Sequence, residues 1–210
     1  MEADFWHKKW ENSQLGFHES DTNPLLLRHF QRLNLDAGAR IYLPLCGKTR
    51  DIAWLLEKGY QVVGVELSEV AVKQLFEELG AVPEVSSLGQ LMHYHAESID
   101  IYVGDIFDIT ADVLGSVDAI YDRAALVALP PEMRVEYTQH LRETTAHAKQ
   151  LLICLQYDQL QMSGPPFSVR ADEVRQHYAA DYDVTQLEVV DRGEKLKGRV
   201  EVTEVVWLLV

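Results

Sequence analysis

Short apolar segments alternate with helical patterns along most of this chain, and that alternation limits the folds that it can adopt. The apolar segments are flanked by Gly, Asp or Pro, as strands buried on both faces usually are. In such a chain, successive strands lie parallel and the connecting helices cover both faces of one sheet. The predicted strands are Arg40–Leu43, Gln61–Val65, Ile99–Val103, Val117–Tyr121, Gln150–Gln156, Tyr182–Val189 and Glu201–Val210.

Helix signals occupy the intervals between these strands. Ser68 is a typical N-cap for a helix over Glu69–Leu79, and Gly80 ends it. Further helices are predicted over Pro24–Leu33, Thr49–Lys58 and Pro131–Ala148.

The last two predicted strands depart from the alternation of strands and helices, because only a polar segment, residues 191–198, separates them. They are therefore predicted to form an antiparallel hairpin. Leu91–His95 and Ile99–Val103 suggest a second, smaller hairpin. The expected fold is a doubly wound α/β fold with a mostly parallel seven-stranded sheet and a C-terminal antiparallel hairpin.

Length and charge narrow the possible functions. The 210 residues contain no repeat or Pro/Gly-rich linker, so one domain over residues 1–210 is expected. The net charge of −14 argues against nucleic-acid binding, which needs Lys and Arg clusters. No run of 18 apolar residues and no signal-peptide pattern occurs, which predicts a cytoplasmic protein without a membrane span. Residues 1–38 are aromatic-rich at their start and are expected to fold back as a helical lid.

The turn after the first predicted strand is the first candidate site. Its Gly-Lys-Thr sequence is not a P-loop, because Tyr42 stands where that motif needs a glycine. Gly47 is the only glycine of the turn, so the fingerprint for dinucleotides is also missing. A cofactor without phosphates remains, and S-adenosylmethionine is the main candidate. The alternative is an ordinary strand-to-helix turn.

A carboxylate and a short loop extend this candidate site. Glu66 ends the second strand, 19 residues after Gly47, where an acid can accept hydrogen bonds from ribose hydroxyls. The alternative is a charge that merely caps the strand. The loop Gly104–Asp108 follows the third strand and either flanks an adenine ring or only caps that strand.

Two features point to an acceptor pocket. Arg123 leaves the fourth strand at its carboxyl end, where open α/β sheets bind ligands, and small residues follow it. The alternative is an exposed ion pair with Asp122. The pair Pro165-Pro166 forms either a stiff apolar shelf beside a pocket or a plain loop stiffener.

Metal binding is not expected. His93 and His95 alternate on one strand face, but no third ligand is evident beside them in the sequence. Cys46 and Cys154 are too few for a four-thiolate zinc site. A surface hairpin is therefore the favoured interpretation of the two histidines.

Taken in order, these segments resemble the bacterial members of the thiopurine S-methyltransferase family. The combination of Pro-Leu-Cys-Gly-Lys with Asp-Arg-x-Ala-Leu-Val-Ala is specific, and the matches span most of the chain. The matching segments are Phe5-Trp6, Trp10, Phe17-His18, Tyr42–Lys48, Val63–Ser68, Ile106–Asp108, Tyr121–Ala128, Tyr157-Asp158 and Gly164–Phe167.

The resemblance implies a Rossmann-like S-adenosylmethionine-dependent methyltransferase fold. It also implies methyl transfer to the sulfur of thiopurines or similar aromatic or heterocyclic thiols, with selenium and tellurium compounds as further acceptors. By the same resemblance, the partner is a small molecule, the product is S-adenosylhomocysteine, and we expect a monomer. No metal is implied.

The resemblance further implies roles for individual residues. The predicted cofactor contacts are Trp6, Trp10, Phe17, Leu45, Glu66, Leu67, Ile106 and Arg123. Phe17, Arg123 and Pro166 would border the acceptor. Arg123 would position the thiolate, with no clear general base. A basic residue of the last hairpin, Lys195 or Lys197, would approach the acceptor.

Two alternative functions, each from a different class of protein, remain possible from the sequence. A non-catalytic module would bind the nucleoside without turning over an acceptor. An NAD(P)-dependent oxidoreductase would transfer hydride, and the missing glycine fingerprint counts against it.

Overall fold

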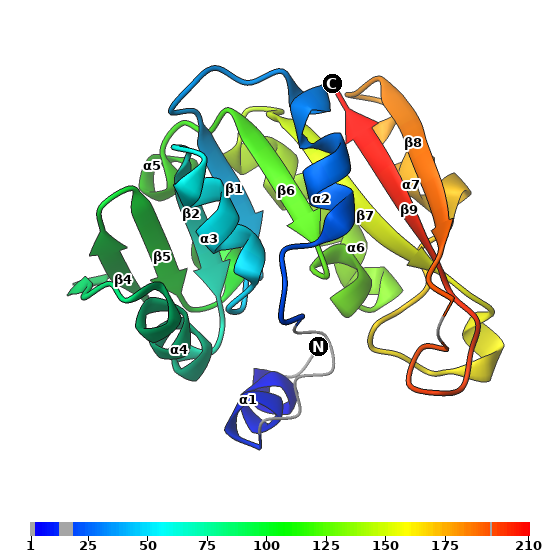
Figure 1. The fold of residues 1–210 in the computed structure, drawn as a ribbon, viewed down its shortest axis with the longest axis horizontal. Coiled ribbons are helices and arrows are strands. Elements are labelled where there is room, and N and C mark those ends of the chain that lie inside the picture. The colour runs from blue at the N-terminus through cyan, green and yellow to red at the C-terminus, as the bar shows by residue number, and fades with distance from the viewer. Residues whose placement is uncertain (1–2, 13–18, 194) are drawn as a thin grey trace.

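The computed structural model describes residues 3–12, 19–193 and 195–210, and its fold is the predicted α/β class. One sheet has the order β3-β4-β5-β2-β1-β6-β7-β9-β8 (Figure 1). The middle strands, from β5 to β7, are parallel, and the strands at both edges are antiparallel. The strands are β1 Arg40–Pro44, β2 Gln61–Glu66, β3 Glu84–Leu88, β4 Leu91–Ala96, β5 Ile99–Val103, β6 Ala119–Arg123, β7 Lys149–Gln156, β8 Val184–Asp191 and β9 Thr203–Leu209.

Helices cover both faces of this sheet, as a doubly wound fold requires. Buried residues of α2, α3 and α4 form one apolar cluster with one face, and those of α5, α6 and α7 form a second cluster with the other. The helices are α1 Ala3–Glu11, α2 Pro24–His29, α3 Arg50–Glu57, α4 Glu69–Leu79, α5 Ala111–Leu114, α6 Pro131–Thr144 and α7 Ala171–Tyr178. Short 3₁₀ turns occupy Phe30–Leu33 (η1), Ile106–Asp108 (η2), Leu126–Ala128 (η3) and Gln159–Gln161 (η4).

The sheet of the described residues has nine strands, so the expected number of seven was wrong. The smaller hairpin suggested by the sequence is present as β4 and β5. The unexpected strand is β3, whose residues are all exposed. A strand without a buried face lacks the alternation of apolar and polar residues by which strands are recognised.

Helix ends agree with the sequence where a capping residue marks them. The Ser68 hydroxyl accepts from Ala71 N, and Gly80 ends α4 in a left-handed conformation. The predicted helix over Pro131–Ala148 is shorter, because α6 ends at Thr144 and residues 146 and 147 have positive φ. The predicted helix over Pro24–Leu33 is α2 followed by the 3₁₀ turn η1.

The N-terminal helix lies at the carboxyl ends of the central strands. In Figure 1, α1 stands below the arrowheads of β1 and β6, and it contacts α4. Residues Ala3–Glu11 are helical and lie at the side of the sheet on which α/β folds bind ligands. Among the described helices, none is both long and apolar enough to cross a membrane.

Candidate active site

The turn between β1 and α3 is held against the neighbouring strand. Cys46 N donates to Val65 O of β2 at 3.0 Å, and the Thr49 hydroxyl accepts from Asp51 N at the start of α3. Leu45 and Gly47 have positive φ values of 46° and 53°. The left-handed conformation is easy for glycine and strained for leucine, so the turn has a shape that an ordinary connection would avoid.

Glu66 joins this turn to the end of β2. One carboxylate oxygen accepts from Gly47 N at 2.8 Å and the other accepts from Ser68 N at 2.9 Å. Burial raises the pKa of Glu66, and these backbone donors work in the opposite direction. The backbone of Leu67 is a third donor to this carboxylate. A carboxylate can accept about four hydrogen bonds, so capacity for a further donor remains.

Trp10 covers the same turn from α1. Its side chain is buried, and a Cβ placed on Gly47 would lie only 3.1 Å from Trp10 Cζ2. The absence of a side chain at Gly47 therefore lets the indole approach the backbone of the turn. Trp6 lies one helical turn earlier and stacks edge-to-face with Phe5 at 5.3 Å. Phe17, also predicted at the site, lies outside the described residues.

Two further predicted cofactor residues lie just beyond the carboxyl ends of β2 and β5. Leu67 follows Glu66 and is half-buried. Ile106 begins η2 directly after β5, is buried, and belongs to the apolar cluster against which Leu45 packs. Asp105 stabilises that turn by accepting from Phe107 N. The structure thus brings Trp10 and Glu66 each into contact with Gly47, and it places Leu45 and Ile106 in one cluster.

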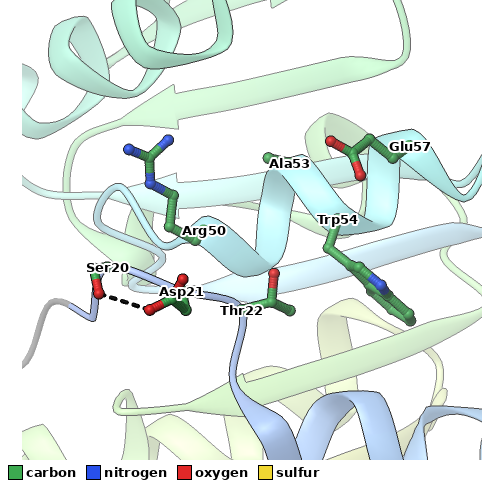
Figure 2. A pocket seen from close by; sticks show the side chains of 7 residues that line it. All are labelled: Ser20, Asp21, Thr22, Arg50, Ala53, Trp54 and Glu57. Carbon is green, nitrogen blue, oxygen red and sulfur yellow. Dashed lines mark hydrogen bonds between the residues drawn. The ribbon is translucent and has the colours of Figure 1, made fainter.

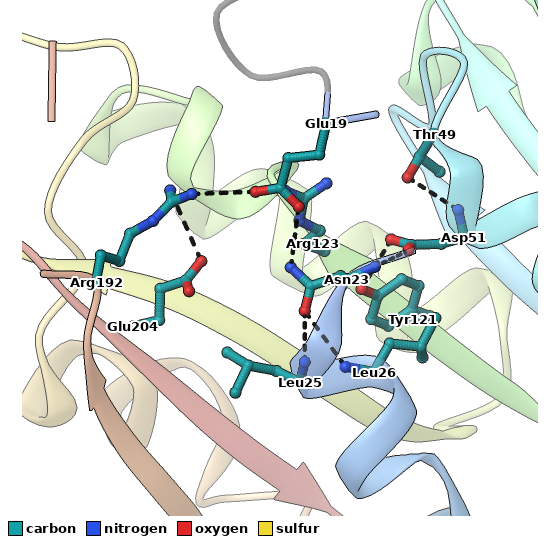
Figure 3. A network of polar contacts seen from close by, with 10 residues as sticks. All are labelled: Glu19, Asn23, Leu25, Leu26, Thr49, Asp51, Tyr121, Arg123, Arg192 and Glu204. Atoms are coloured by element: carbon teal, nitrogen blue, oxygen red, sulfur yellow. Dashed lines mark hydrogen bonds and ion pairs between the residues drawn. The ribbon is translucent and has the colours of Figure 1, made fainter. Parts of the chain in front are cut away.

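Arg123 ends β6 and forms an ion pair that the sequence did not predict. Its guanidinium lies 2.7 Å from the Glu19 carboxylate, and its side chain is only 12% exposed (Figure 3). The suggested Asp122–Arg123 pair is not formed. Asp122 points to the other face of β6, where it accepts from Leu126 N at 3.1 Å and from the Tyr137 hydroxyl at 2.7 Å.

Glu19 also binds a second arginine, which sequence reasoning missed. Arg192, which directly follows β8, lies 3.1 Å from the same Glu19 oxygen and 3.9 Å from Glu204 of β9 (Figure 3). Burial raises the pKa of Glu204, while Arg192 and Arg123 lower it. These residues are far apart in the sequence, and no local motif marks them as partners.

The segment after Glu19 is anchored to the sheet beside this ion-pair network. Asn23 N donates to one Asp51 oxygen at 2.7 Å, and the Tyr121 hydroxyl donates to the other at 3.0 Å. The Asn23 side chain in turn caps α2 (Figure 3). The chain is therefore anchored at Asn23, four residues after the Glu19 carboxylate that pairs with Arg123.

Lys197, from the connection between β8 and β9, contacts the loop that contains Pro165 and Pro166. Lys197 Nζ donates to Pro165 O at 2.7 Å, and the Tyr157 hydroxyl donates to Pro166 O at 2.7 Å. Burial, together with Lys9 and Arg199, lowers the pKa of Lys197. Lys195, the other candidate, instead lines a depression with Asp158, Gln161, Arg199 and Glu201.

A depression beside α3 does not coincide with these residues (Figure 2). None of the predicted cofactor or acceptor residues lines it. Its lining consists of Ser20, Asp21, Thr22, Arg50, Ala53, Trp54 and Glu57. The candidate site is therefore defined by the contacts at the carboxyl ends of β1, β2, β5 and β6.

Comparisons with known proteins point to one enzyme family. The family model described as Thiopurine S-methyltransferase (TPMT) matches residues 1–209. A thiopurine S-methyltransferase of Xanthobacter autotrophicus is 53% identical over 210 residues, which cover 100% of this chain and 99% of that protein. One of Acinetobacter baylyi is 46% identical over 215 residues, covering 100% and 98%.

The fold is shared with a solved structure of low sequence identity. It is that of the Burkholderia thailandensis 1,6-didemethyltoxoflavin-N1-methyltransferase with bound 1,6-didemethyltoxoflavin and S-adenosylhomocysteine. The TM-score is 0.66 at 14% identity, and the match covers 99% of this chain and 87% of that one. The predicted Rossmann-like methyltransferase fold is thereby confirmed.

Proposed function

Because this chain belongs to the thiopurine S-methyltransferase family, we propose that it methylates the sulfur of thiopurines or of similar heteroaromatic thiols. The chain is an S-adenosylmethionine-dependent methyltransferase that acts on a small molecule. An NAD(P)-dependent oxidoreductase is thereby set aside. The choice of acceptor and the roles of individual residues are the proposal.

The observation that carries the cofactor site is the double anchoring of Glu66. Its oxygens hold Gly47 N and Ser68 N, so the carboxylate lies between the β1 turn and the start of α4. In the proposed complex, the carboxylate also accepts hydrogen bonds from the ribose hydroxyls. A charge-assisted hydrogen bond of this kind contributes roughly 1.5–3 kcal/mol.

The aromatic residues of α1 form the proposed cover of the cofactor. Trp10 packs on Gly47, and Trp6 and Phe17 complete the cover in this proposal. An aromatic face near the sulfonium adds cation–π attraction of roughly 0.5–2 kcal/mol. Leu45, Leu67 and Ile106 supply apolar contacts that keep water away from the reacting methyl group.

Arg123, Pro166 and Lys197 border the acceptor in this proposal. Heteroaromatic thiols are partly ionised near neutral pH, and the positive charge of Arg123 favours the thiolate. The thiolate sulfur attacks the methyl carbon from about 3–3.5 Å, opposite the sulfonium sulfur. The new S–CH₃ bond forms as the old one breaks, which releases S-adenosylhomocysteine, and the thiol proton has already left to solvent. Selenium and tellurium compounds are proposed as further acceptors, because selenium and tellurium, like sulfur, carry a polarisable lone pair that can attack the methyl carbon.

Glu19 and the acceptor compete for Arg123 in this scheme. The Glu19 carboxylate already pairs with both Arg123 and Arg192, so an anionic acceptor has to compete with it. We therefore propose that the acceptor thiolate displaces Glu19 from Arg123 and leaves Glu19 paired with Arg192.

The test is methyl transfer from labelled S-adenosylmethionine to a thiopurine, with selenite and tellurite assayed alongside. Glu66→Gln is the test variant, and Glu77→Gln, an exposed position on α4, is its control. We expect label on the thiopurine with the wild type and the control, and a strong loss with Glu66→Gln. Cofactor binding without label on any acceptor would instead support the non-catalytic binding module.

A further inference from the structure

Two strands at one edge of the sheet bring two histidines and an aspartate together. His93 and His95 alternate along β4, and Asp100 of β5 lies directly opposite His95 in the antiparallel register. His93 Nε2 is 2.8 Å and His95 Nδ1 is 2.9 Å from the same oxygen, Asp100 Oδ1. The structure thus supplies the third ligand that the sequence alone did not reveal.

The separations suit a metal ion with little movement. One ligand atom from each of the three residues lies within 4.8 Å of the others. Ligand atoms about 2.0–2.2 Å from a tetrahedral zinc ion are about 3.3–3.6 Å apart. The two nitrogens therefore need to move from Asp100 Oδ1 by less than about 1 Å, as a metal ion replaces the protons that now join them.

Neighbouring side chains hold each ligand in orientation. Arg40 Nη2 lies 3.3 Å from Asp100 Oδ2, the oxygen that the histidines do not use, and so leaves Oδ1 directed at them. The His93 ring stacks on Tyr102 at 4.6 Å with an interplanar angle of 14°. Although burial opposes ionisation, hydrogen bonds from His93, His95 and Arg40 lower the pKa of Asp100. Partners that fix ring and carboxylate orientation are typical of metal sites.

The cluster is also accessible and has room for a further ligand. The side chains of His93, His95 and Asp100 are 22%, 51% and 24% exposed, so an ion can enter from solvent. Glu84 of β3 lies directly opposite His95 on its other side and is exposed. Residues that face each other across antiparallel strands have side chains on the same face, so Glu84 or water can provide the fourth ligand.

We propose that His93, His95 and Asp100 form a binding site for a divalent transition-metal ion, with Zn²⁺ as the preferred occupant. Two imidazoles and one carboxylate are a ligand set that Zn²⁺ uses. An ion bound there joins β4, which carries both histidines, to β5, which carries Asp100. The site is separate from the proposed cofactor site, because Asp100 is near the amino end of β5 whereas Glu66 and Ile106 lie at or beyond the carboxyl ends of their strands.

The experiment is calorimetric titration of the chain, freed of any affinity tag, with Zn²⁺. We expect one ion per chain. His95→Gln and Asp100→Asn are each expected to weaken binding by at least about tenfold, the loss seen when even an outer partner of a metal site is removed. His147→Gln, an exposed histidine outside the cluster, is the control and is expected to bind like the wild type.

Thermal unfolding provides a second measurement that does not depend on activity. Zn²⁺ should raise the Tm of the wild type and of His147→Gln in proportion to the logarithm of its concentration, and at each concentration it should raise the Tm of His95→Gln by clearly less. If the wild type does not bind Zn²⁺, or if His95→Gln binds it equally well, the proposal is wrong. A lower Tm of His95→Gln with no effect of metal on any variant would identify a hydrogen-bonded structural cluster instead.

Discussion

Replacing Asp122 with asparagine is expected to remove a pH-dependent loss of stability from the fold. Asp122 is fully buried between β6 and α6, next in sequence to Arg123. Burial raises its pKa from 3.8 to about 6, although hydrogen bonds from Tyr137 and from the backbone of Leu126 and Ala125 lower it in part. Asparagine keeps the shape and an acceptor oxygen, but it does not titrate.

The size of the effect follows from the two pKa values. An acid whose pKa rises on folding binds its proton more tightly in the folded state. It therefore stabilises the fold below its unfolded pKa of 3.8 and loses that contribution as the pH rises through about 6. One pKa unit corresponds to about 1.4 kcal/mol, so the loss amounts to about 3 kcal/mol.

Urea unfolding at a series of pH values measures this loss. The free energy of unfolding of the wild type minus that of Asp122→Asn should fall by about 3 kcal/mol between about pH 3.5 and about pH 7.5. Asp36→Asn, an exposed aspartate ahead of β1, is the control and should show no comparable trend. A difference that stays constant across this pH range would refute the reasoning.

Three further substitutions test the contacts of the site. Gly64→Ala places a Cβ 2.8 Å from Cys46 Sγ and should lower the free energy of unfolding by about 1–3 kcal/mol in urea; wild-type stability would contradict this. Gly47→Ala adds strain at a φ of +53° and pushes on Trp10, so calorimetry should show S-adenosylhomocysteine binding weakened by at least about fivefold, and equal affinity would remove the role of this turn. Lys197→Met should raise the KM for the thiol more than the matched variant Lys195→Met does; equal KM values would show that Lys197 does not face the acceptor.

Local signals in the sequence were sufficient for the fold class and for the contact between the β1 turn and the end of β2. Gly47 and Glu66 were linked by their spacing alone, and the structure joins them by a hydrogen bond of 2.8 Å. Such spacing is informative because a parallel strand–helix–strand unit brings the ends of its two strands to the same edge. Ser68 and Gly80 marked both ends of α4 because capping depends on single residues.

The contacts that the sequence did not reveal depend on pairing between distant segments. Glu19 meets Arg192 only because β8 is packed near the N-terminal segment, 173 residues away in the chain. Asp100 faces His95 only because the register of β4 on β5 sets them opposite each other. A shift of one residue in that register would turn Asp100 to the other face, and no local motif fixes it.

The position of β9 has a consequence for how this protein is made. β9 follows β8 in the chain, yet it lies between β7 and β8 in the sheet. During synthesis β8 therefore emerges before the only strand that it pairs with in the described sheet. A ribosome that pauses after β8 exposes an unpaired strand, which is prone to aggregate. The sheet is complete only when β9, Thr203–Leu209, has paired with both β7 and β8. The edge of the sheet near Arg192 and Glu204 therefore forms only after β9 has been synthesised.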